Sequence, residues 1–149
     1  MTQEDKELLL KDLCGRLPYS PKMKGTVYIF EKNDYGGTVK EEEVTFELYQ
    51  LHNDLGVMYR GEWISIDECK PCLFPMSKMT REQLYEIRGI LGNDCEIEND
   101  FIRIINSDRN TLSYQEINAV FNYCYKHNLD INGLIPKGLA IDATGLNIY

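Results

Sequence analysis

The sequence predicts an α+β fold, in which an antiparallel β-meander carries about three helices packed mainly on one face, as a single compact domain over residues 1–149. Strand signals follow one another within residues 24–73, and helical periodicity occurs before and after them. No repeat, low-complexity stretch or long linker divides the chain. A chain of 149 residues can bury enough surface to fold without disulfides or a metal.

A short helix is expected near the N-terminus. Thr2 can cap it, and Leu9 and Leu13 lie at helical spacing. Gly15 and then Pro18 are expected to end it. This first helix is expected to dock on the rest of the domain through its leucines.

The meander is expected over residues 24–73, which are rich in β-branched and aromatic residues and are interrupted by turn signals. Apolar and polar residues alternate from Val44 to Tyr49, as in a strand with one buried face. Pro71 and Pro75 are expected to end the sheet region. The expected strands are 25–30, 44–49, 57–60 and 63–66, with turns at 33–37 and 53–56.

A second helix is predicted to begin at Thr80, which forms a capping box with Gln83. Gly92 can terminate it, and a small hairpin is expected over residues 95–105. The apolar stripe of this helix is Leu84, Ile87, Ile90 and Leu91.

A third helix is predicted by the capping box of Ser113 with Glu116, and Asn128 is expected to stop it. The tail over residues 129–149 contains several aliphatic residues and is expected to be packed. The apolar stripe of the third helix is Ile117, Val120, Phe121 and Cys124.

Charge and composition exclude several classes of function. The net charge of −8 disfavours generic nucleic-acid binding, because a phosphate backbone attracts clustered cations. Residues 1–7 are acidic where an export signal is basic, and no apolar run approaches the ~20 residues of a membrane-spanning helix. Five cysteines, an odd number, favour a reducing compartment. The expected location is therefore cytoplasmic, without membrane binding.

Cys69 and Cys72 form a C-x-x-C motif, which can be a redox couple or half of a zinc site. A redox role is disfavoured because the next expected helix begins only near Thr80. Cys124 and His127, at i and i+3, could complete a Cys3His zinc set, although Cys124 also lies on an apolar stripe. We interpret the cysteines as core or surface thiols and assign no metal ligand.

A run of alternating carboxylates could surround a cation. Its members are Asp94, Glu96, Glu98 and Asp100. An EF-hand count from Asp94 places Asn99 where glycine is required and Ile105 where glutamate is required. We therefore interpret the run as an exposed strand edge, and we interpret residues 41–43, three consecutive glutamates, in the same way.

No complete catalytic set is visible. The chain has two histidines, His52 and His127, and no G-x-S-x-G elbow. Residues 133–138 have glycine and lysine in the wrong order for a phosphate-binding loop. No catalytic or cofactor-binding residue is therefore assigned, and the sequence favours a non-enzymatic role.

Exposed aromatic side chains are the remaining candidates for a functional surface. The chain has ten tyrosines and one tryptophan, and both residue types are frequent anchors of protein interfaces. Tyr19 lies among Arg16, Lys22 and Lys24 in the one local island that is both basic and aromatic. Such an island could contact an acidic partner or a nucleotide.

Three blocks of the chain, residues 7–19, 73–80 and 128–142, resemble a family of short hypothetical proteins from gut Bacteroidales bacteria and their phages and mobile elements. The strand region between the first two blocks is only loosely similar. This chain has Phe74 where the family often has an arginine before the proline. The resemblance implies no activity, cofactor or site residue, and it implies a cytoplasmic accessory protein of a phage or mobile element.

The sequence therefore favours a non-enzymatic interaction module whose partner is another protein. One alternative is a small metal-binding or nucleotide-handling protein, which would use the two cysteines of the C-x-x-C motif with Cys124 and His127, or the island around Arg16. The other alternative is a structural or assembly protein that acts as a homo-oligomer.

Overall fold

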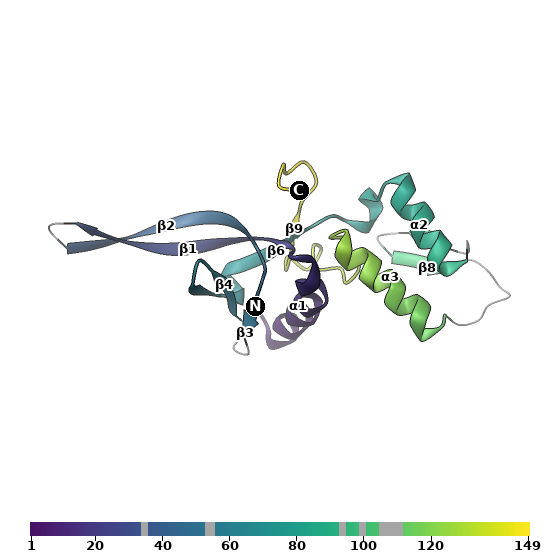
Figure 1. The fold of residues 1–149 in the computed structure, drawn as a ribbon, viewed down its shortest axis with the longest axis horizontal. Coiled ribbons are helices and arrows are strands. Elements are labelled where there is room, and N and C mark those ends of the chain that lie inside the picture. The colour runs from purple at the N-terminus through teal and green to yellow at the C-terminus, as the bar shows by residue number, and fades with distance from the viewer. Residues whose placement is uncertain (34–35, 53–55, 93–94, 99–100, 105–111) are drawn as a thin grey trace. The chain divides into compact units, whose positions relative to one another are not determined.

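The computed structural model describes residues 1–33, 36–52, 56–92, 95–98, 101–104 and 112–149 (Figure 1). The chain forms two compact units, the first comprising Met1–Cys72 with Ile148–Tyr149 and the second Leu73–Asn147. The described residues form three α-helices and nine strands, and five pairs of neighbouring strands are antiparallel. The α+β class is confirmed, and a single domain over residues 1–149 stays a prediction.

The first unit begins with α1 (Gln3–Arg16), which is followed by a single 3-10 turn, Leu17–Tyr19. Thr2 caps α1 as predicted, and its capping-box partner is Asp5. The helix continues past Gly15, because proline and not glycine ends it. Leu9 and Leu13 are fully buried, which confirms that the leucines form its docking face.

The longest elements are β1 (Lys22–Asn33) and β2 (Gly36–Glu47), which pair along their whole length as an antiparallel hairpin. Both strands are longer than predicted. The predicted alternation is confirmed at the end of β2 and just after it, since Phe46 and Leu48 are buried while Thr45 and Tyr49 are exposed. The predicted turn between the strands includes residues 34–35, which lie outside the described residues.

The other two predicted strands are present as β4 (Gly56–Tyr59) and β5 (Glu62–Ser65), which form a separate three-stranded sheet with the short strand β3 (Leu51–His52), which was not predicted. These strands follow the predicted up-and-down order. Within the first unit the predicted meander is therefore divided between two sheets, because β3 pairs with β4 and not with β2. A 3-10 turn, Ile66–Glu68, leads out of β5.

The expectation that Pro71 ends the sheet region is wrong. Pro71 lies inside β6 (Cys69–Leu73), where it pairs with Met23 of β1. The N–H of Leu48 donates to the carbonyl of Pro21, so odd-numbered residues of β1 are the ones that bond to β2. The N–H and C=O groups of Met23 therefore point toward β2 and away from β6. Because Pro71 lies opposite Met23, its missing N–H removes no hydrogen bond between β1 and β6.

The second unit contains α2 (Arg81–Leu91) and α3 (Tyr114–Lys126), which begin at the two predicted capping boxes. Gly92 ends α2 in the left-handed conformation, at a φ of 75°, and Asn128 follows α3 with a φ of 53°. The expected hairpin is present as β7 (Cys95–Glu98) and β8 (Phe101–Ile104).

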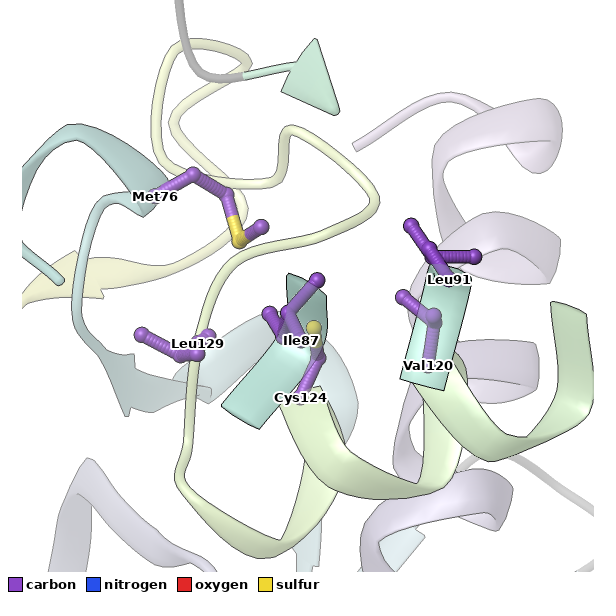
Figure 2. Close-up of a cluster of buried hydrophobic side chains, with 6 residues drawn as sticks. All are labelled: Met76, Ile87, Leu91, Val120, Cys124 and Leu129. Atoms are coloured by element: carbon purple, nitrogen blue, oxygen red, sulfur yellow. The ribbon is translucent and has the colours of Figure 1, made fainter. Parts of the chain in front are cut away.

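Figure 2 shows the core of this unit, in which α2 and α3 face each other. Its buried residues are Met76, Ile87, Leu91, Val120, Cys124 and Leu129. The predicted stripe of α3 is only partly correct, because Ile117 is 39% exposed and Tyr125 is buried in addition. Met76 belongs to a 3-10 turn, Met76–Lys78, that precedes α2.

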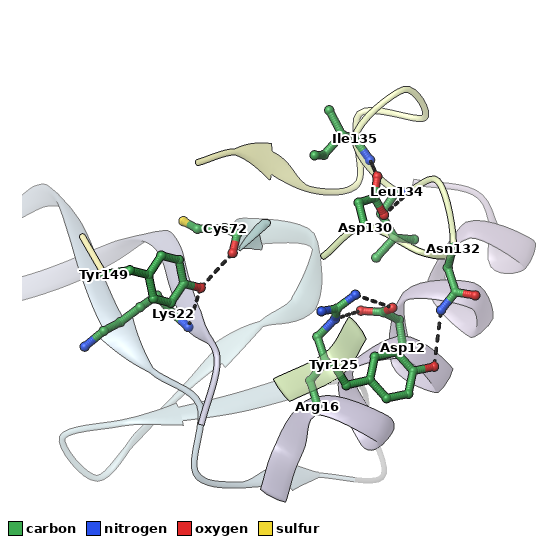
Figure 3. Close-up of polar contacts among 10 residues, drawn as sticks. All are labelled: Asp12, Arg16, Lys22, Cys72, Tyr125, Asp130, Asn132, Leu134, Ile135 and Tyr149. Carbon is green, nitrogen blue, oxygen red and sulfur yellow. Dashed lines mark hydrogen bonds and ion pairs between the residues drawn. The ribbon is translucent and has the colours of Figure 1, made fainter. Parts of the chain in front are cut away.

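The tail is packed as predicted as far as Ala143, which is fully buried. The carboxylate of Asp130 organises its first loop by accepting hydrogen bonds from the N–H groups of Leu134 (2.7 Å) and Ile135 (2.8 Å) (Figure 3). The short strand β9 (Ile141–Asp142) follows, and the N–H of Ala143 donates to the carbonyl of Leu73 at 2.7 Å.

Candidate interaction surface

The two thiols of the C-x-x-C motif point into the protein. Cys69 and Cys72 are 1% and 0% exposed, and the Sγ of Cys69 donates to the carbonyl of Ser65. Burial raises the pKa of Cys69 to about 12 and also raises the pKa of Cys72. Both groups are therefore held as neutral thiols, whereas redox and metal-binding cysteines act as thiolates.

The other two residues of the hypothetical zinc set belong to the second unit. Cys124 lies in the hydrophobic core, and the His127 ring packs against Tyr123 in a tilted arrangement with 4.4 Å between ring centroids. In the part of the chain that the structure describes, no group of three or more histidine, cysteine and acidic residues is placed to hold a metal ion. The side chains of the alternating carboxylate run lie outside the described residues.

The interpretation of Tyr19 as the centre of a basic island is wrong. Arg16 is fully buried, and its Nε and Nη2 donate to the carboxylate of Asp12 at 2.5 and 3.0 Å (Figure 3). The two lysines of the island are paired across the hairpin, Lys22 with Glu47 and Lys24 with Glu43, at 2.5 and 2.7 Å. The cations that the sequence places near Tyr19 are therefore engaged by carboxylates of the same unit.

Three of the exposed large apolar side chains of the first unit lie on the β1–β2 hairpin. Tyr28 is 49% exposed, Ile29 37% and Val39 63%. β6 pairs with β1 only from Met23 to Gly25, so from Thr26 onward β1 has no strand partner except β2 among the described residues. We refer to residues 26–33 and 36–43 as the ribbon.

Figure 1 shows that, within this unit, the ribbon continues well beyond the short strands β3 and β4. The register assigns each side chain to a face, because residues that pair across an antiparallel ladder point to the same side. One face carries Thr26, Tyr28, Val39, Glu41 and Glu43, and the opposite face carries Val27, Ile29, Lys40 and Glu42. Both faces of the ribbon thus combine apolar side chains with carboxylates.

The outer edge of β2 has a defined set of backbone groups. Because the Leu48 N–H bonds to Pro21, even-numbered residues of β2 bond to β1 and odd-numbered residues turn their N–H and C=O groups outward. The outward groups along the strand belong to Val39, Glu41, Glu43 and Thr45. No described strand pairs with this edge, since β2 is the terminal strand of its sheet.

A second exposed aromatic feature lies on the three-stranded sheet. The rings of His52 and Trp63 are 4.8 Å apart, and Trp63 is 46% exposed. They line an open hollow of about 290 Å³ together with Gly56, Ile64 and Ser65. His52 is exposed, and its contact with Trp63 is a tertiary feature that sequence reasoning missed.

The ribbon was also missed at the sequence level, although part of its signal was present. The glutamates of residues 41–43 were interpreted as an exposed edge, and Glu41, Glu42 and Glu43 are indeed exposed on the terminal strand. The length of the pairing and the exposure of Tyr28 could not be read from the pattern, because its aromatic and β-branched residues are typical of buried strands.

None of the helices formed by the described residues is long and apolar enough to cross a bilayer. Comparison of the chain with family models, with curated proteins and with solved structures finds no match in any of the three.

Proposed function

We propose that this chain is a non-enzymatic protein-interaction module that binds another protein through the β1–β2 ribbon. The observation that carries the proposal is the exposure of Tyr28, Ile29 and Val39 on a hairpin that has no further strand partner among the described residues. Tyrosine and aliphatic side chains are frequent anchors of protein interfaces.

Physical stability supports the same proposal. An isolated two-stranded hairpin is marginally stable in water, and a third strand or a packed face is needed for more. A partner that covers Tyr28 and Val39, which share a face of the ribbon, would stabilise it by about 1 kcal/mol for each of these exposed side chains. Binding a partner protein at this site would therefore increase the stability of the ribbon, which is marginal in the free chain.

The cellular setting is part of the proposal. The resemblance of the three sequence blocks leads us to propose a cytoplasmic accessory protein of a phage or mobile element, and the net charge of −8 favours a protein partner over a nucleic acid.

Photo-crosslinking tests the proposal. Benzoylphenylalanine is placed at Tyr28 on the ribbon, and in separate chains at Tyr85 and Tyr114, which are 74% and 79% exposed on the helices. We expect a discrete adduct in the cell from position 28. Excess unmodified chain should abolish this adduct, whereas excess chain carrying Val39→Asp should not.

The outcome that contradicts the proposal is a smear of weak adducts at position 28 no stronger than those at the two helical positions. Circular dichroism of each variant checks that the fold is kept, because all three positions are exposed.

A further inference from the structure

We propose that the outer edge of β2 accepts an extended, lysine- or arginine-bearing segment of the partner protein as an additional strand. This inference rests on the proposed function and names the chemistry of the partner. It is carried by two independent properties of β2, the direction of its backbone groups and the charge of its side chains.

The backbone of β2 offers a continuous template. The N–H and C=O groups of Val39, Glu41, Glu43 and Thr45 face outward. They recur every second residue, a repeat of about 6.8 Å, which is the spacing that an added strand requires. An extended segment of about seven residues would therefore complete the ladder on this side.

The side chains of β2 select a cationic segment. Glu41 and Glu43 lie on one face of the ribbon and Glu42 lies on the other, and all three are exposed. In the described part of the chain Glu43 is paired with Lys24, while no ion pair is formed by Glu41 or Glu42. Cross-strand neighbours of opposite charge stabilise a ladder and like charges oppose it.

The alternation of side chains along β2 also determines the pattern within the partner segment. Residues opposite Glu41 and Glu43 are two positions apart, so a lysine or arginine at i and i+2 would meet both carboxylates on one face. Val39 extends this face next to Glu41 and is 63% exposed, so an apolar residue at the next alternate position would cover it.

A second copy of this chain is the less favourable occupant. Antiparallel pairing of two β2 edges about Glu41 would place that carboxylate against its own copy, in a chain of net charge −8. Repulsion between the glutamates thus opposes self-association through this edge. An added strand that carries lysine or arginine is favoured instead, because its side chains attract these carboxylates.

The test uses two synthetic peptides of seven residues. The first has lysine at positions 3 and 5, valine at positions 1 and 7 and threonine at the other positions, and the second has glutamate in place of lysine. Fluorescence anisotropy should show saturable binding of the lysine peptide and at least tenfold weaker binding of the glutamate peptide. The double substitution Glu41→Lys with Glu43→Lys should reverse this preference, because these two side chains share the face that the lysines meet. Glu7→Lys, on the exposed surface of α1, is the control and should leave it unchanged.

Amide hydrogen exchange locates the peptide. We expect the lysine peptide to slow exchange at the N–H groups of Val39, Glu41, Glu43 and Thr45, because these face outward. The N–H groups of even-numbered neighbours already bond to β1 and should change little. Thr45→Pro removes an outward N–H without changing charge, and it should weaken peptide binding severalfold while the hairpin is kept.

Equal binding of the two peptides, or slowed exchange without the odd-numbered pattern, overturns this inference. So does a dimer, seen by sedimentation, that Thr45→Pro dissociates, because the edge would then belong to a second copy. If Tyr28 crosslinks to a partner but the lysine peptide does not bind, the strand-addition proposal fails and the interaction function stands. If Tyr28 gives no discrete adduct, the proposed function itself fails.

Discussion

The hydroxyl of Tyr149 donates a hydrogen bond of 2.7 Å to the backbone carbonyl of Cys72, 77 positions earlier in the chain (Figure 3). The same hydroxyl accepts from the N–H of Lys22 at 3.2 Å. The register that pairs Met23 with Pro71 would place Lys22 opposite Cys72, at a position where the backbones bond directly. The tyrosine hydroxyl therefore bridges the two strands at the point where their ladder ends.

Tyr149→Phe is expected to destabilise the protein by about 1–2 kcal/mol, because it leaves the Cys72 carbonyl and the Lys22 N–H without the hydroxyl that bridges them. Urea unfolding followed by circular dichroism measures this change. Tyr114→Phe is the matched control, since Tyr114 is 79% exposed, and it should change stability by less than about 0.5 kcal/mol. Equal midpoints for the two variants would contradict the bridging role.

The same hydroxyl predicts a stability loss at alkaline pH. Burial raises the pKa of Tyr149 to about 12, from 10 in the unfolded chain. The unfolded state then releases its proton first, so the stabilising contribution is complete below pH 10 and is lost as the pH rises through 12. The unfolding free energy should fall more steeply over this window in the native chain than in Tyr149→Phe. Parallel curves would show that the hydroxyl titrates normally.

Gly25→Ala is expected to destabilise the first unit by about 1–3 kcal/mol. A Cβ at Gly25 would lie 2.7 Å from the Cβ of Cys69 and 2.9 Å from the carbonyl of Glu68, so β1 and β6 would have to separate. Gly89→Ala is the control, because nothing lies within 4 Å of a Cβ there and α2 should gain up to about 1 kcal/mol. Thermal unfolding compares the variants, and a neutral Gly25→Ala would contradict the close approach.

Asp12→Ala is expected to cost about 3–5 kcal/mol, because Arg16 would keep its charge in a fully buried site without the carboxylate that now accepts from it. Replacing both residues, Asp12→Leu with Arg16→Met, should recover most of that loss. Chemical unfolding of the two single variants and the double variant forms a thermodynamic cycle. A double variant no more stable than Asp12→Ala would show that the pair does not act as a unit.

The accessibility of the thiols provides a further test, made in a Cys95→Ser background. Cys14 is exposed, whereas Cys69, Cys72 and Cys124 are buried. One thiol should react rapidly with a disulfide reagent in the native state, and the other three should react only as the protein unfolds. Rapid modification of Cys72 in the native state would contradict the inert role that burial gives the C-x-x-C motif.

The predictions from sequence succeeded where the determining contacts are local. The capping boxes of Thr80 with Gln83 and Ser113 with Glu116 are present because each involves side chains three residues apart. The alternation around Phe46 identified the buried face of β2, since it depends only on the twofold period of a strand.

The predictions failed where distant segments decide the outcome. The residue type of Arg16 is typical of an exposed site. The residue type of Pro71 is typical of the end of a strand. The structure buries Arg16 because Asp12 accepts from its guanidinium, and it keeps Pro71 in a ladder because Met23 presents no hydrogen-bonding group to it. The Asp12 partner lies four residues before Arg16 in the same helix and was available in the sequence, whereas the burial of that pair and the pairing of Pro71 with Met23 are decided by segments distant in the chain.

The sequence by itself determined the α+β class, the starts of the three helices and the acidic character of residues 41–43, because these follow from composition and from contacts within a few residues. Only the tertiary structure decided that β6 leaves β1 after Gly25, that the ribbon then has one partnerless edge, and that Tyr28 and Val39 stay exposed on it. Strand pairing joins residues far apart in the chain, and which edge stays open depends on all of those pairings together.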